Sequence, residues 1–98
     1  MCIKIYQSVV VFPSEDAARA SFKSIHDGEA TDLGQAVGAP PLGQESLAMV
    51  REKSGANEIT VVFRQKRILV RMTMSGADME QFQPYLKRAE ARVKLWSP

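Results

Sequence analysis

The chain has 98 residues, with 45% hydrophobic and 24% charged side chains and a formal net charge of +2. This length fits one domain over residues 1–98, and the composition excludes a disordered chain, which combines low hydrophobicity with high net charge. A single cysteine, Cys2, and a single histidine, His26, exclude an intramolecular disulfide and the four-ligand zinc sites built from these residues.

The first two elements are a strand and a helix. Residues 3–12 are rich in β-branched and aromatic side chains, which predicts a strand that ends before Pro13. Ser14 is a favourable N-cap, and apolar side chains then recur at helical spacing, at Ala18, Phe22 and Ile25. We therefore predict a helix over 14–27.

A long connection follows over residues 29–44. Its glycines and prolines predict a loop, with one short helical turn near Leu33 to Val37. A connection of this length is unusual in a small domain and is often functional. Because it also carries apolar side chains, we expect it to pack on the body of the domain.

Three further strands are predicted over 46–53, 58–64 and 67–75, the last two as a hairpin. If Gln65 and Lys66 form its turn, Phe63 faces Ile68, Val61 faces Val70, and Ile59 faces Met72 on one face. The same alternation pairs Val62 with Leu69 on the opposite, mostly polar face. This apolar pair predicts that the polar face is covered by the 29–44 loop, a second subunit or a ligand.

A second helix closes the chain. Apolar side chains recur at steps of three and four from Met79 to Trp96, and Pro84 is accommodated best if the helix begins near Gln83. The resulting order, β-α-β-β-β-α, predicts an α+β fold. We expect an antiparallel four-stranded sheet with the two helices on one face.

The strongest local feature that bears on function is a cluster of basic side chains. Residues 1–48 carry 3 basic and 6 acidic side chains (net −3), whereas residues 49–98 carry 10 basic and 5 acidic (net +5). Part of this excess lies on the predicted hairpin, at Arg64, Lys66, Arg67 and Arg71. Such a cluster suits an anion or nucleic-acid surface, or it is a solvated sheet face whose charges discourage edge pairing. Nucleic acid is disfavoured, because no exposed aromatic side chains interleave with these arginines.

No catalytic or metal-binding motif is present. His26, Asp27 and Glu29 match no ligand spacing, and a histidine in the last turn of a helix complements the helix dipole. We therefore expect no catalytic residue, no bound metal and no cofactor.

A metal-dependent enzyme module of the βαβββ type remains an alternative. It needs histidine and glutamate ligands on strands. Here the histidine lies on a helix, and the strand glutamates are Glu45, Glu52 and Glu58.

The sequence also bears on location. No apolar stretch approaches the length of a membrane span, so we expect none. No signal peptide precedes the first strand, which predicts a cytoplasmic protein as the sequence is written. An extracytoplasmic location is expected instead if the chain is a piece of a longer protein with an upstream signal segment.

Three segments carry a family resemblance: Val11–Phe22, Ala39–Ser46 and Val61–Val70. They resemble small uncharacterised bacterial domains of secreted proteins and lipoproteins, some of them similar to the PsbP/Mog1-like α/β sandwich. In those domains a segment like Leu42–Ser46 leads into the central hairpin, although Gln44 stands here where an acid is common. The resemblance implies a non-enzymatic binding or accessory domain.

Together these observations predict a domain that binds a protein partner, a second copy of itself or a small ligand, and does no chemistry. The predicted binding surface combines the polar sheet face and the hairpin tip. Its residues are Arg64, Arg67, Arg71, Val62 and Leu69.

Overall fold

The computed structural model describes residues 4–29, 35–38, 41–53, 55–76 and 78–96. The elements, in chain order, are β1 (Lys4–Val11), α1 (Glu15–Ser24), a π-helical turn η1 (Ile25–Glu29), β2 (Gln35–Val37), β3 (Glu45–Lys53), β4 (Ala56–Gln65), β5 (Ile68–Ser75) and α3 (Met79–Trp96). The four long strands and the two helices confirm the predicted order and the α+β class. Within these ranges no helix has the length and apolar content needed to cross a membrane.

The sheet is antiparallel throughout and has the strand order β1-β5-β4-β3-β2. The short strand β2 extends the four predicted strands and corrects the helical turn expected near Leu33 to Val37. The residues of β2 pair with β3, and Val37 lies opposite Ala48. Their backbone groups therefore bond to a neighbouring strand, whereas those of a helical turn would bond within the segment. Leu33 lies outside the described residues.

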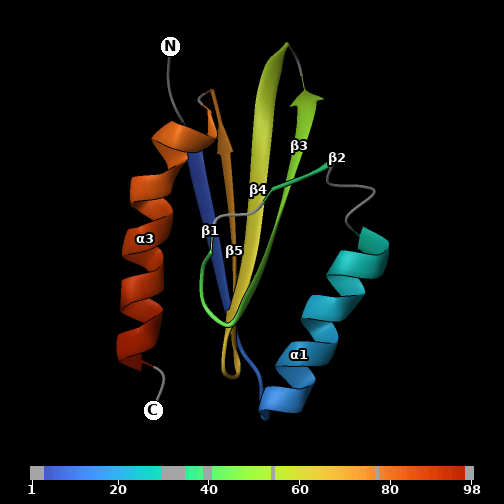
Figure 1. The fold of residues 1–98 in the computed structure, drawn as a ribbon, viewed down its shortest axis with the longest axis vertical. Helices are drawn as coiled ribbons and strands as arrows, with labels where there is room; N and C mark the ends of the chain where they lie inside the picture. Colours follow the sequence, from blue (N-terminus) through green and yellow to red (C-terminus); the bar gives the residue numbers. More distant parts are fainter. Residues whose placement is uncertain (1–3, 30–34, 39–40, 54, 77, 97–98) are drawn as a thin grey trace.

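The two helices lie on opposite faces of the sheet, not on one face as the sequence predicted (Figure 1). On one face, α3 packs Phe82, Leu86 and Val93 against Val61 and Val70 of the central strands. On the other face, a second core cluster contains Phe22, Ile25, Leu47, Met49, Val62 and Leu69. The sheet is therefore buried on both sides, and α1 is the cover that Val62 and Leu69 required.

The β4–β5 hairpin has a register two residues away from the predicted one. Val61 lies opposite Met72 and Phe63 opposite Val70, because the turn is formed by Lys66 and Arg67. A shift of two residues keeps every side chain on its predicted face, since side chains alternate with period two. The prediction of which hairpin side chains share a face was therefore correct, although the predicted pairs across the two strands were wrong.

The second helix begins at Met79 and not near Gln83, so Pro84 lies inside it. Asp78 and Gln81 form a reciprocal cap: the Gln81 N–H donates to Asp78 Oδ1 (3.0 Å), and the Asp78 N–H donates to Gln81 Oε1 (3.1 Å). Two satisfied backbone donors and the buried Phe82 stabilise this first turn despite the proline.

The two-sided packing predicts different responses to one substitution on the same sheet face. Val62→Thr should lower the free energy of unfolding by about 1–3 kcal/mol, because it places an unpaired hydroxyl at a position with 0% exposure. Val10→Thr is the matched control, because Val10 is 45% exposed and should change stability by less than about 0.5 kcal/mol. Urea denaturation measures both; equal, small effects would show that α1 does not cover Val62.

Candidate functional site

The basic cluster predicted as a binding surface is built around a buried arginine. Arg64 is only 5% exposed. Its Nε donates to Glu45 Oε2 (2.5 Å), and its Nη1 donates to Gln44 Oε1 (2.9 Å) and to the Lys66 carbonyl (2.7 Å). Glu15, in the first turn of α1, lies 3.5 Å from the same Nη1. The Nε and Nη1 donors of Arg64 are therefore used within the fold, and the burial of its side chain leaves little of it accessible to a partner.

The apolar pair of the predicted surface is also inaccessible. Val62 has 0% and Leu69 6% exposure, and both pack in the α1-side core with Phe22. The sequence predicted that the 29–44 loop, a second subunit or a ligand covers these two side chains, whereas α1 covers them in the structure. The sequence pattern placed them correctly on the second face, and the helix that covers that face was assigned to the wrong side.

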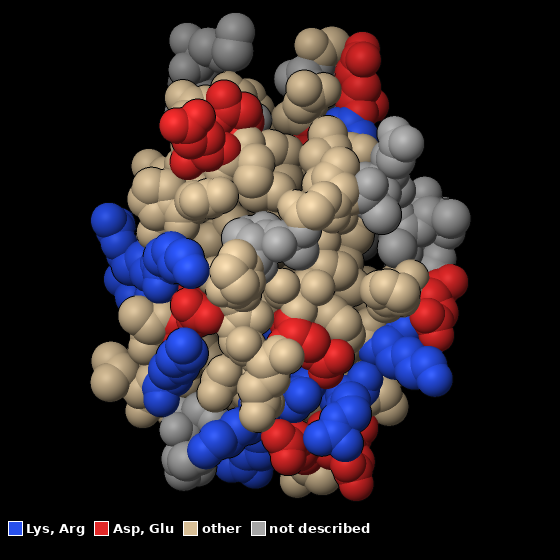
Figure 2. All heavy atoms as spheres, viewed as in Figure 1, with Lys and Arg blue, Asp and Glu red and all other residues tan. Residues whose placement is uncertain are grey.

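The other two predicted residues differ in position. Arg67 is exposed in the hairpin turn, and Arg71 is half-buried on β5 opposite Val62. Figure 2 shows acidic side chains interspersed with the basic ones on the viewed face, so no uninterrupted basic patch covers it. The arrangement does not favour the nucleic-acid alternative, which requires contiguous cationic surface.

The segment before β3 joins several parts of the molecule. Leu42 is 2% exposed in the α3-side core, which confirms for this residue the predicted packing of the loop. The Gly43 N–H donates to Glu90 of α3. Gly43 has φ +56°, and a Cβ there would lie 2.4 Å from the Arg64 carbonyl oxygen. Only glycine fits this crossing without displacing backbone.

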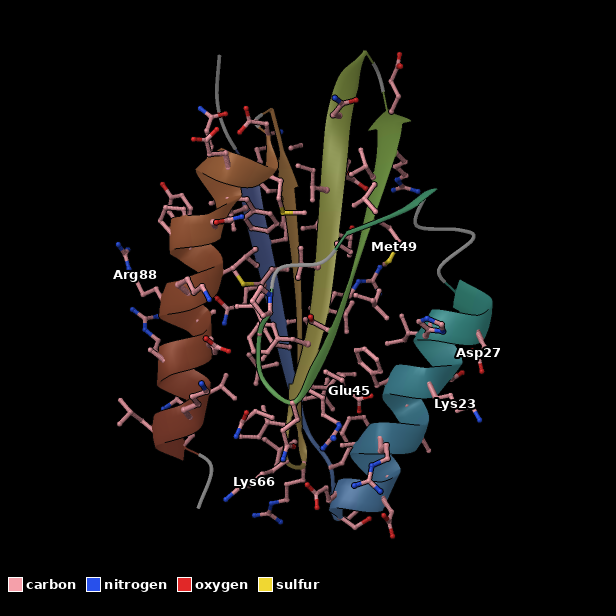
Figure 3. All side chains as sticks on the ribbon, viewed as in Figure 1. Lys23, Asp27, Glu45, Met49, Lys66 and Arg88 are labelled. Atoms are coloured by element: carbon pink, nitrogen blue, oxygen red, sulfur yellow. The ribbon has the colours of Figure 1, made fainter. Side chains whose placement is uncertain are left out.

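A pocket of about 560 Å³ opens between α1 and β3 and contains the only histidine. Its lining is formed by Arg19, Phe22, Lys23, His26, Asp27, Glu45 and Ser46. Figure 3 shows Lys23 and Asp27 projecting from the outer side of the helix, whereas Glu45 lies between the helix and the sheet. The volume suits a small ligand.

Several of the pocket's charged groups already have partners. Arg19 pairs with Asp16 at 3.3 Å, His26 with Asp27 at 3.0 Å, and Glu45 with Arg64. The sequence singled out His26 and Asp27 but gave no sign that β3 would face them.

The metal-enzyme alternative is not favoured by the side chains in the described ranges. Among them, no three His, Cys, Asp or Glu residues are grouped closely enough to hold a metal ion. Of the strand glutamates, Glu45 pairs with Arg64, and Glu58 accepts from Arg51 at 2.8 Å. Two of the three carboxylates that the alternative needs are thus bound to arginines.

An accessible apolar surface lies on β1. This strand is at one edge of the sheet, and every residue of it except Ile5 is exposed. Tyr6 is 64% exposed, Val10 45% and Val11 59%. The sequence interpretation missed this surface, because an apolar strand is normally a core strand and nothing in its composition shows that it lies at an edge.

The backbone of β1 is half unpaired among the described residues. The Phe12 N–H donates to the Arg67 carbonyl at 2.8 Å, so these opposite residues form a hydrogen-bonded pair. Hydrogen-bonded and non-bonded pairs alternate along an antiparallel ladder. The even-numbered residues of β1 therefore bond to β5, and the odd-numbered ones direct N–H and C=O groups away from the sheet. We call these the outer-edge residues: Ile5, Gln7, Val9 and Val11.

The Arg64 cluster predicts a large loss of stability on substitution. Arg64→Met should lower the free energy of unfolding by about 2–3 kcal/mol, less than for a fully buried pair because Glu45 keeps some access to water. Arg67→Met, in the exposed turn, is the control and should stay within about 0.5 kcal/mol of the parent. Urea denaturation would contradict a structural role for Arg64 if the two variants were equally stable.

The crossing at Gly43 predicts a second contrast. Gly43→Ala should cost at least about 2 kcal/mol, because the left-handed backbone disfavours a side chain and the new Cβ meets the Arg64 carbonyl. Gly38→Ala is the control, since no atom lies within 4 Å of its added Cβ. Thermal unfolding followed by circular dichroism tests both, and similar melting temperatures would show that the crossing is not tight.

Comparisons of the chain with protein-family models, with curated proteins and with solved structures found no significant match.

Proposed function

We propose that this chain is a protein-interaction domain that binds an extended segment along the outer edge of β1 and has no catalytic role. The observation that carries the proposal is the row of backbone donors and acceptors on Ile5, Gln7, Val9 and Val11, next to exposed apolar side chains. An added strand satisfies such groups directly, which is how many domains bind extended peptides.

The edge lacks the features that usually prevent strand addition. Natural edge strands are shortened, bulged, charged or interrupted by proline. β1 is eight residues long, pairs with β5 without a break in register, and carries one charged residue, Lys4. A strand so unprotected supports the proposal that pairing along it is part of the function.

A shallow hollow beside β1 supports the same proposal. A pocket of about 150 Å³ lies between β1 and α3, with Ile5, Gln7 and Met72 on the sheet side and Tyr85 and Arg92 among the helix residues. Side chains of an added strand on this face would lie against the flank of α3. The helix thus offers contacts that a bare sheet edge would not have.

This proposal keeps the binding or accessory role implied by the resemblance to bacterial secreted and lipoprotein-type domains, and the PsbP/Mog1-like relationship itself stays a proposal. It moves the binding surface from the hairpin to β1. The side chains of the hairpin surface are largely used within the fold, whereas the outer-edge backbone groups have no strand beside them among the described residues.

A synthetic peptide tests the proposal. A labelled, end-capped peptide with the sequence of residues 4–11 should bind the domain, as measured by fluorescence anisotropy. Gln7→Pro in the domain should weaken binding at least about tenfold, because proline removes an outward N–H and obstructs the incoming strand. Proline at this position leaves the bonds to β5 in place, since the Gln7 N–H points away from them.

Gln7→Thr is the matched control, because threonine keeps the backbone donor and suits a strand. It should bind the peptide like the parent. Circular dichroism and the melting temperature of each variant establish that the fold is kept. If the proline and threonine variants bound the peptide equally well, or the parent did not bind it at concentrations at which it is a monomer, binding along the β1 edge would be ruled out.

A further inference from the structure

Resting on the proposed strand-binding function, we infer that the natural occupant of the β1 edge is β1 of a second copy, paired antiparallel about a two-fold axis at Ser8. The two sheets would then join into one continuous sheet. A two-fold axis perpendicular to the sheet keeps each face on its own side, so both copies of α3 lie on one face and both copies of α1 on the other.

The hydrogen-bond pattern selects this register. With Ser8 on the axis, Ile5 pairs with Val11 of the second copy and Gln7 with Val9, so every outer-edge residue gains a partner within the strand. With Gln7 on the axis, Val11 would have to pair beyond the start of β1. With Val9 on the axis, Ile5 would lie opposite Pro13, which has no N–H.

Side chains are matched in the same register. On the α1 side, Tyr6, 64% exposed, lies opposite Val10 of the second copy, an aromatic and β-branched pair that stabilises antiparallel strands. On the α3 side, Ile5 lies opposite Val11. The register therefore brings three of the exposed apolar side chains of β1, Tyr6, Val10 and Val11, against apolar partners, and places Val9 opposite Gln7.

The available area suits a dimer. Tyr85 is 43% and Trp96 58% exposed, and both lie on the α3 flank that lines the hollow beside β1, since Trp96 follows Arg92 by one helical turn. With Tyr6, the exposed parts of these aromatic side chains amount to roughly 300 Å² per copy. The valines and the paired backbone bring the interface toward the roughly 800 Å² per partner typical of stable complexes.

Charge gives the dimer a distinctive salt dependence. Arg88 and Arg92 of each copy lie on the same face near the seam, and each copy carries a net charge of +2. Figure 3 shows Arg88 pointing away from the sheet, so it stays in solvent. Like charges on the two copies repel, and salt screens that repulsion. The dimer should therefore hold or tighten as salt rises, whereas an acidic partner strand would bind more weakly.

Cysteine cross-linking tests the register. In a Cys2→Ser background, Ser8→Cys should oxidise to a covalent dimer, because a non-hydrogen-bonded pair places its Cα atoms about 4.5 Å apart, within disulfide range. Gln7→Cys and Val9→Cys are the matched controls. In this register Gln7 lies opposite Val9 of the second copy, so each control cysteine is two residues along the strand from the same cysteine in the other copy. The Cα–Cα distance then exceeds disulfide range, and cross-linking should be at least about tenfold slower. Faster cross-linking at either control position would overturn the Ser8 register.

Sedimentation equilibrium of the parent chain tests the dimer itself. A dimer that holds or tightens with salt, and that Val11→Lys weakens at least about tenfold, supports the inference; Val11 is 59% exposed, so the lysine leaves the monomer intact. A monomer at every concentration, or a dimer insensitive to Val11→Lys or weakened by salt, overturns it. If the chain is a monomer but still binds the 4–11 peptide, only this inference fails and the strand-binding function stands.

Discussion

The hydrogen bonds of the Arg64 guanidinium are the constraint on which this fold depends. A guanidinium presents its donors in one plane, so its acceptors must approach from fixed directions. Here they come from Glu45 and Gln44 at the entrance of β3 and from the Lys66 carbonyl in the hairpin turn, with Glu15 at the start of α1 close by. One buried side chain thus sets the relative positions of the hairpin, the strand beside it and the first helix.

Gly43 extends this constraint to the other face of the sheet. Its backbone crosses against the Arg64 carbonyl, and its N–H donates to Glu90 of α3. The neighbouring Leu42 enters the α3-side core. The short Leu42–Glu45 segment therefore joins both helices to the centre of the sheet. These contacts explain the residue types in this segment by structure alone, with no need for a ligand.

The four long strands, the two helices and their order could be predicted from the sequence, because alternation in β4 and β5 and the spacing of apolar residues in α3 are local patterns. The hairpin register could not, since moving the turn by one residue, from Gln65–Lys66 to Lys66–Arg67, shifts the pairing by two and leaves Val61 and Phe63 on the same face. The side on which α1 packs depends on how the chain crosses the edge of the sheet after β1. Only Val62 and Leu69 signalled that a second apolar face existed, and that signal did not identify its cover.

The candidate site was less predictable than the fold for a physical reason. Sequence reasoning finds sites through unusual side chains, and here Arg64, Glu45 and Glu58 are used to hold strands together. Among the described residues, β1 has no strand beside its outer edge, so backbone groups are left without a strand partner along an apolar strand that would be ordinary in the middle of a sheet. The N–H and C=O groups of Gln7 and Val9 are the same in every residue, and only the strand order places them at an edge. If a domain binds through such backbone groups, the strand order determines its binding surface, and the side chains alone do not identify that surface.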